Sequence, residues 1–263
     1  MQGRSNSPSR TIPSRHAPTT RFSVFSYEQY WALERVIQMK NNLIAVLLCL
    51  AAAAPAHGQK ADKRLAESTA VLKTILAKND IPNGLLNKAE CVMVYPSVKK
   101  VGLGISGRGY GRGVLVCRTG PKMEGKWGVP IMYTLDTHSF GAQIGSSSTD
   151  YVLLVMSQRG AEKVLSGKLK LGAGASAVAG PSGANASDFN DPNVDILSYS
   201  RSEGLFAGAS LGTASMEADD DINKELYGKE IDAAQMVRDG QTPVPPGAQP
   251  LIAVLRKASP KHM

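Results

Sequence analysis

A run of alternating glycines in the middle of the chain limits most strongly what this sequence can fold into. Between Val101 and Val116 the glycines are Gly102, Gly104, Gly107, Gly109, Gly111 and Gly113. Each glycine inside a helix costs about 1 kcal/mol relative to alanine, so the run is a poor helix. In strands, glycine marks bulges, sharp bends and close approach of two backbones. The run therefore predicts a bent strand with a tightly packed backbone.

Later segments have the same small-residue character, and an apolar strand precedes the run. Cys91–Tyr95 reads as a buried strand that Pro96 ends. Residues 139–156, 169–180 and 205–212 are further strand candidates, separated by turn signals. The fold class predicted is α+β, with a Gly-rich curved antiparallel sheet or partly closed barrel that bends at its glycines.

Helical patterns flank this sheet. From Asp62 to about Lys78 apolar residues recur on one broad face, which predicts an N-terminal amphipathic helix. Residues 159–165 suggest a short helix, and short C-terminal helices are expected from Asp219 to about Val237. We expect one domain over residues 59–240, followed by a Pro-rich and basic tail over residues 241–263.

The N-terminal part resembles a targeting segment. Met39 and Lys40 precede an apolar run over residues 43–54 and a small-residue site at Ala54-Pro55-Ala56. This pattern predicts a secretory signal peptide over about residues 39–58, and the run is shorter than the roughly 20 residues of a membrane span. Residues 1–38 then read as a mis-called or disordered extension, with a genuine long n-region as the alternative. The expected location is exported, periplasmic or secreted.

Two cysteines remain after that segment. In an exported protein Cys91 and Cys117 can form a disulfide, whereas two separate buried thiols are equally consistent with the sequence.

The formal net charge is +8, and the basic residues are unevenly placed. Seven basic residues and one acidic residue, Glu124, fall between positions 99 and 126, a local net charge of +6. Each such cation contributes about 1 kcal/mol near an anionic bilayer. An ordinary solvated sheet face is the alternative, because neighbouring strand residues point to opposite faces. The candidate lipid-binding residues are Lys99, Lys100, Arg108, Arg112, Arg118, Lys122 and Lys126.

The helix over residues 62–78 raises a similar choice. A basic amphipathic helix can lie in a membrane interface, and Lys63, Arg64 and Lys73 would then contact lipid. The alternative is that its apolar stripe packs on the sheet.

Other chemistries find little support. Residues 219–230 place acidic side chains in an EF-hand-like order, but Lys224 stands where the loop needs glycine. Residues 102–107 match a dinucleotide fingerprint without the helix that must follow it. Asp136, His138 and Ser139 are the residue types of a Ser-His-Asp catalytic triad, but no Gly-x-Ser-x-Gly nucleophile elbow surrounds Ser139. We therefore expect no enzyme activity, no metal, no cofactor and no nucleic-acid partner.

Several segments together resemble the SYLF domain family, from about Leu65 to Val237. The most specific is residues 199–208, Tyr-Ser-Arg-Ser-Glu-Gly-Leu-Phe-Ala-Gly, followed by Asn223 and Tyr227-Gly228. The others are the opening amphipathic helix, residues 81–89, the strand ending at Tyr95-Pro96, the run ending at residues 113–118, Trp127-Gly128-Val129-Pro130 and residues 140–145.

The resemblance implies non-enzymatic binding of anionic lipids, notably phosphoinositides in eukaryotic members, and actin binding in some fungal ones. An exported protein would meet little actin, so we expect this chain to share the family's lipid binding rather than its actin binding. We expect the partner to be an anionic phospholipid membrane surface. The alternative is a cell-envelope structural or protein-interaction module without lipid specificity.

Overall fold

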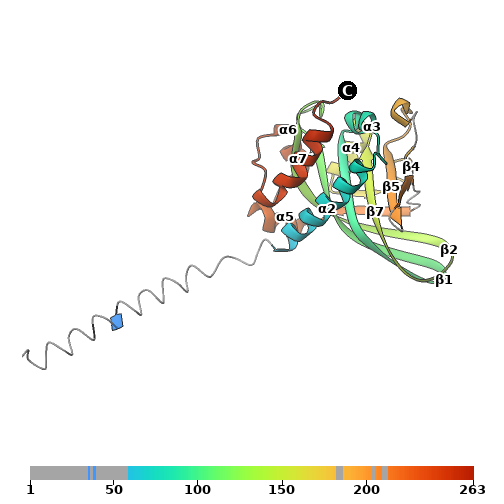
Figure 1. The fold of residues 1–263 in the computed structure, drawn as a ribbon, viewed down its shortest axis with the longest axis horizontal. Helices are drawn as coiled ribbons and strands as arrows, with labels where there is room; N and C mark the ends of the chain where they lie inside the picture. The colour runs from blue at the N-terminus through green and yellow to red at the C-terminus, as the bar shows by residue number, and fades with distance from the viewer. Residues whose placement is uncertain (1–34, 36–37, 40–58, 182–185, 203–204, 209–212) are drawn as a thin grey trace, which may run out of the picture. The chain divides into compact units, whose positions relative to one another are not determined.

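The computed structural model describes residues 35, 38–39, 59–181, 186–202, 205–208 and 213–263 (Figure 1). Two units are distinguished, Met1–Pro55 and Ala56–Met263. In the first, only three residues are described, and they are helical and exposed. The extension and nearly all of the predicted signal peptide therefore lie outside the described residues. None of the described helices has the length and apolar character that crossing a membrane requires.

The second unit is the predicted α+β domain, built around a seven-stranded sheet. Two long strands, β1 (Cys91–Arg118) and β2 (Trp127–Val155), pair antiparallel along almost their whole length. In Figure 1 they run out side by side to a common far end. We call this paired structure the ribbon. The shorter strands are β3 (Lys168–Lys170), β4 (Ala177–Ala179), β5 (Ile196–Ser202), β6 (Leu205–Gly208) and β7 (Thr213–Ala218).

The short strands extend the sheet from β2. The order is β3-β7-β2-β5-β4, with β6 on β5. β2 pairs with β7 through residues 133–138 and with β5 through residues 150–155, so its two halves carry different neighbours. All pairings between the named strands are antiparallel except the one between β4 and β5. The sheet is therefore the curved, largely antiparallel structure expected from the sequence.

The glycine run allows β1 to fold back on itself. A Cβ on Gly113 would lie 2.3 Å from the Val94 carbonyl oxygen, and one on Gly111 would lie 2.6 Å from Val98 Cγ2. The later half of β1 thus lies directly against its earlier half, at distances that no side chain allows. A disulfide joins Cys91 to Cys117, whose Cα atoms are 3.9 Å apart, so the two ends of β1 meet.

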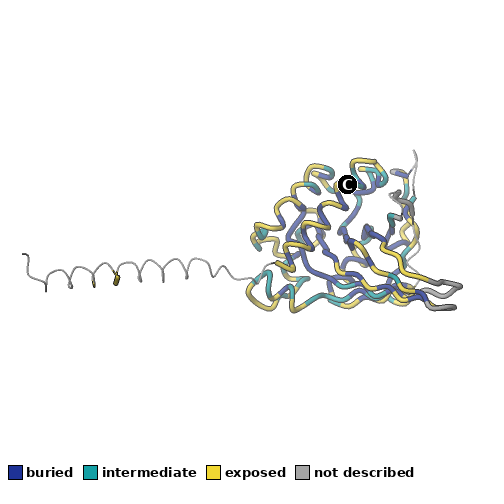
Figure 2. Tube along the Cα trace, turned by 60° about the horizontal axis from the view of Figure 1, so that its bottom comes forward, coloured by how far each residue is buried: buried dark blue, intermediate teal, exposed yellow. Residues whose placement is uncertain are grey.

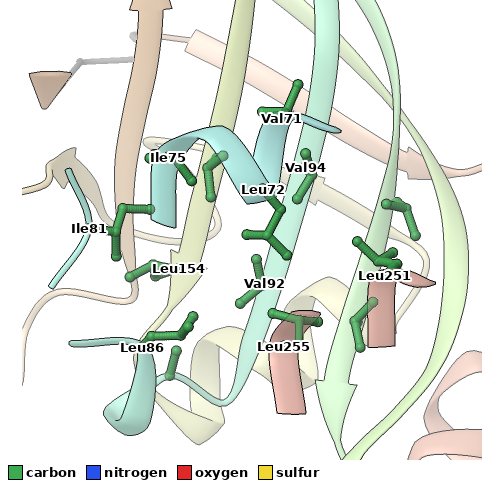
Figure 3. Close-up of a cluster of buried hydrophobic side chains, with 14 of the residues drawn as sticks. Val71, Leu72, Ile75, Ile81, Leu86, Val92, Val94, Leu154, Leu251 and Leu255 are labelled. Carbon is green, nitrogen blue, oxygen red and sulfur yellow. The ribbon is translucent and has the colours of Figure 1, made fainter. Parts of the chain in front are cut away.

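Alternate residues of β1 enter two separate cores. Val92 and Val94 belong to the core beneath α2 (Gln59–Ala77), α3 (Asn83–Lys88) and α7 (Gln249–Ala258). Figure 3 shows Leu72 of α2 and Leu255 of α7 beside them. Met93 and Tyr95 enter the second core, which contains residues of α4 (Gln158–Leu165) and α6 (Ala233–Asp239). Both faces of β1 are buried here, which explains the unbroken apolar sequence of residues 91–95.

Two sequence interpretations need correction. Pro96 does not end the first strand: β1 continues, with a register shift between Tyr95 and Val98 and a positive φ of 49° at Ser97. Residues 241–263 are not a tail. After α5 (Asp220–Tyr227) and α6, a short 3₁₀ turn η3 (Pro246–Ala248) leads into α7, whose Leu251, Ile252 and Leu255 are fully buried. A further 3₁₀ turn, η2, spans Ala186–Asp188.

Candidate functional site

Cationic side chains converge in a groove between α2 and β1. The groove has a volume of about 580 Å³. Five basic residues and one acidic residue, Glu67, contribute to its walls. The lining residues are Lys60, Lys63, Arg64 and Glu67 of α2 and Pro96, Ser97, Lys99, Tyr110, Gly111 and Arg112 of β1.

Each wall follows from local geometry. On α2 the four lining residues follow the spacing i, i+3, i+4 and i+7, which places them along one side of the helix. On β1, Lys99 belongs to the earlier half and Arg112 to the later half, and only the fold-back brings the two to one groove.

Arg64 lies deepest in this site. It is 5% exposed, and its Nη2 donates to Asp219 Oδ2 at 2.8 Å, which ties α2 to the start of α5. Its other terminal nitrogen, Nη1, is buried without a hydrogen-bond partner among the described residues. Burying an unsatisfied donor costs about 1–3 kcal/mol, more for a charged group. This nitrogen is closed to solvent, so the groove does not present it to an external acceptor.

The other cations of the groove are exposed. Lys60, Lys63, Lys99 and Arg112 all reach solvent. The guanidinium of Arg112 lies 5.7 Å from the centre of the Tyr110 ring, and its Nε donates to Tyr110 Oη at 3.4 Å. The hydrogen bond from Arg112 to Tyr110 raises the pKa of Arg112. The groove therefore presents positive charge at neutral pH.

The remaining predicted lipid-binding residues have other surroundings. Lys100 is half-buried, with its Nζ 5.1 Å from the centre of the Tyr151 ring. Arg108 is exposed on the ribbon and pairs with Asp136 of β2 at 2.9 Å. Lys122 and Lys126 belong to the connection between β1 and β2, and Lys73 lies farther along α2; none of these lines the groove.

The prediction that Arg118 binds lipid is wrong, because its side chain is fully buried. Its Nε donates to the Ala89 carbonyl at 3.2 Å and its Nη2 to the Lys261 carbonyl at 3.0 Å and to Ser259 Oγ. Its guanidinium lies 4.3 Å from the Trp127 ring centre. Arg118 therefore holds the segment after α7 against the sheet and is not available to a membrane.

A titratable pair lies beside this buried cation. Glu90 Oε2 is 3.6 Å from His262 Nε2, and both side chains are at most 15% exposed. Burial raises the pKa of Glu90 to about 7, against the lowering effect of Arg118 and with a smaller raising effect of Glu124. Burial likewise lowers the pKa of His262, and Arg118 adds to that effect.

The raised pKa of Glu90 predicts a pH-dependent stability. A carboxyl whose folded pKa exceeds its unfolded pKa contributes stability below the unfolded value, and this contribution is lost as pH rises toward about 7. His262 acts in the opposite sense, since its stabilisation is lost as pH falls below 6.5. Glu90→Gln should therefore be more favourable at pH 8 than at pH 5, by about 1–2 kcal/mol relative to wild type. Urea unfolding at the two pH values measures this difference; equal effects at both would contradict it.

The alternative chemistries fit the structure poorly. Asp219 bonds Arg64 and precedes α5, and no cluster of three or more potential metal ligands occurs among the described residues. Residues 102–107 lie within β1 and are followed by more strand. His138 is exposed, 3.8 Å from an Asp136 carboxylate that already pairs with Arg108.

Sequence reasoning missed a second cavity, of about 660 Å³, between β2, β7 and the helices α4 to α6. It is lined by Glu217, Asp220 and Asp232 beside small apolar residues, and Lys168 there pairs with Glu217 at 2.7 Å. Its carboxylates disfavour anions, so the two hollows have opposite electrostatic character.

The fold and the groove define an α+β domain with a curled sheet and a cationic surface between its first helix and its folded-back strand. Residues 136–258 match the family described as Ysc84, Las17-binding protein actin regulator. The chain belongs to this Ysc84 or SYLF domain family, as the resemblance predicted. The matched segment includes α7, and the groove residues precede it.

Relatives from fungi and animals align with more of the chain. The SH3 domain-containing protein PJ696.02 of Schizosaccharomyces pombe is 34% identical over 75% of this chain and 46% of its own length. Protein YSC84 of Saccharomyces cerevisiae is 30% identical over 66% of this chain and 37% of its length. The human SH3 domain-containing YSC84-like protein 1 is 30% identical over 78% of this chain and 59% of its own length. The alignments thus cover less than two thirds of these longer proteins, two of which are named for an SH3 domain.

Proposed function

We propose that this domain binds anionic phospholipid membranes through the groove between α2 and β1. The observation that carries the proposal is the convergence of Lys60, Lys63, Lys99 and Arg112 around the buried Arg64. Glu67 lies in the same groove, with its carboxylate 3.9 Å from Lys63 Nζ, so the four exposed cations leave a net of three positive charges. At about 1 kcal/mol per charge this attraction supports peripheral attachment at low salt.

The groove combines two of the sequence hypotheses. Lys63 and Arg64 were candidates because they lie on the possible membrane helix. Lys99 and Arg112 were candidates because they belong to the basic stretch around the glycine run. The apolar face of α2 is occupied, because Leu65, Leu72 and Ile75 are fully buried in the core. In the docked state, α2 therefore contributes its charged side to the membrane and keeps its apolar side in the protein.

We also propose that the domain works outside the cytoplasm. The predicted signal peptide over residues 39–58 motivates this location, and the Cys91–Cys117 disulfide is consistent with it, since disulfides persist in oxidising compartments.

Protein binding is the second candidate function. The matching family is described as a Las17-binding actin regulator, and its relatives include LAS seventeen-binding protein 3 of Saccharomyces cerevisiae. A protein partner with an acidic surface would suit the same groove.

Vesicle co-sedimentation of the wild-type protein tests the lipid proposal. We expect no binding to phosphatidylcholine vesicles and a steep rise in binding as phosphatidylglycerol replaces it. Raising the salt from about 0.05 to 0.5 M should release the protein, because the screening length falls below about 5 Å. If the protein bound neither neutral nor anionic vesicles, the lipid proposal would be contradicted and protein binding would be the remaining candidate function.

A further inference from the structure

The ribbon carries large apolar side chains in an unusual position. Most large apolar residues of the described domain are buried, yet Val101 is 50% and Tyr110 is 48% exposed. Outside the ends of the chain, the other large apolar residue exposed in the described part is Val178 of β4, at 37%. Burial in the core explains neither Val101 nor Tyr110.

The two residues belong to one surface. Tyr110 lines the groove together with Lys99. Val101 is two positions beyond Lys99 on the same strand, so its side chain leaves the same face of that strand. Arg108 and Arg112 flank Tyr110 in the same way, and both are exposed. We call these five exposed residues, Lys99, Val101, Arg108, Tyr110 and Arg112, the ribbon face. Figure 2 shows exposed and buried stretches along the ribbon.

The composition of the ribbon face suits a bilayer better than a protein. Protein interfaces have a contiguous apolar centre from which lysine is depleted. Here two apolar side chains stand apart between three cations. Tyrosine is enriched at the boundary between headgroups and acyl chains, where its ring is buried and its hydroxyl remains solvated. Long basic side chains at that depth extend their charges to the phosphates.

We infer that the ribbon face is the part of the domain that enters the bilayer interface, with Val101 and Tyr110 among the headgroups and the groove cations on the phosphates around them. This inference rests on the proposed membrane function. It adds how deeply the domain enters the bilayer and which part of the sheet makes the contact. The apolar face of α2 is occupied by the core, so insertion through the ribbon requires no unfolding.

Site-specific tryptophan fluorescence tests the inference. Trp127 is 1% exposed and gives a constant signal, and Trp31→Phe removes the other native tryptophan. In that background we compare Tyr110→Trp with Val178→Trp, a matched exposed position on β4. With phosphatidylglycerol vesicles, emission at position 110 should shift to shorter wavelength and be quenched by lipids brominated on their acyl chains. Emission at position 178 should not change.

A second pair of variants measures the contribution to binding. Val101→Ser with Tyr110→Ser should weaken vesicle binding about 10-fold, because half-buried apolar area is lost, whereas Val178→Ser should not. If wild type binds anionic vesicles but position 110 shows neither shift nor quenching, the insertion is refuted and headgroup attachment stands. If wild type binds no anionic vesicle, the proposed function fails as well.

Discussion

Arg118→Met should lower the free energy of unfolding by about 3–5 kcal/mol, because it leaves several acceptors without their donor at about 1–3 kcal/mol for each buried group. Methionine replaces the side-chain stem but supplies no donor. The carbonyls of Ala89 and Lys261 and the hydroxyl of Ser259 would lose their partner, and the contact with Trp127 would lose its cationic character. A loss of this size lowers the folding equilibrium constant at least about 100-fold.

Urea denaturation at neutral pH, followed by the fluorescence of Trp127, measures the effect. Arg112→Met is the matched control, because the same replacement at an exposed arginine should cost about 0.5 kcal/mol or less. The buried role of Arg118 would be contradicted if the two variants lost similar stability.

The sequence predicted those parts of the fold that depend on local pattern. The apolar spacing along residues 62–78 predicted a helix with one apolar face. The structure has α2 there, with that face packed in the core. The alternation of glycine predicted close backbone approach, and Gly111 and Gly113 provide it. Both inferences rest on steric facts that a stretch of chain carries by itself.

The errors came from signals that tertiary structure overrides. Pro96 lacks an amide hydrogen, which normally ends ladder pairing, but the register shift that follows accommodates it within β1. Residues 241–263 were interpreted from their prolines and cations. Yet Pro250 stands in the first turn of α7, where proline is favourable, and Leu251, Ile252 and Leu255 form its buried side.

The site was only partly predictable for the same reason. Sequence identified Lys63, Arg64, Lys99 and Arg112 as candidates, but not that they meet. Their meeting depends on the packing of α2 on β1 and on the fold-back of β1. Likewise, nothing in the local sequence distinguishes Arg118, which is buried, from Arg112, which is exposed six positions earlier. Lys60 was missed, although its spacing from Lys63 and Arg64 was a usable signal.

Reversing charge in the groove should have a large effect on membrane binding. Lys63→Glu with Lys99→Glu removes two attractive charges and adds two repulsive ones, a change of about 4 kcal/mol at about 1 kcal/mol per charge. Even with partial screening, binding to anionic vesicles should fall at least about 100-fold. Both positions are exposed, so the fold should tolerate the changes.

The control variant carries the same net charge and the same substitutions at two other exposed positions. Lys73→Glu changes α2 beyond the groove, and Lys122→Glu changes the connection between β1 and β2. Because neither residue lines the groove, this variant should lose no more than about threefold in binding, from the change in net charge alone.

Co-sedimentation of the two variants with phosphatidylglycerol vesicles at low salt is the decisive comparison. A groove that holds the membrane predicts that Lys63→Glu with Lys99→Glu stays in the supernatant while Lys73→Glu with Lys122→Glu sediments with the lipid. Equal retention of the two proteins on the vesicles would mean that attachment depends on total charge and that the groove between α2 and β1 is not the binding site.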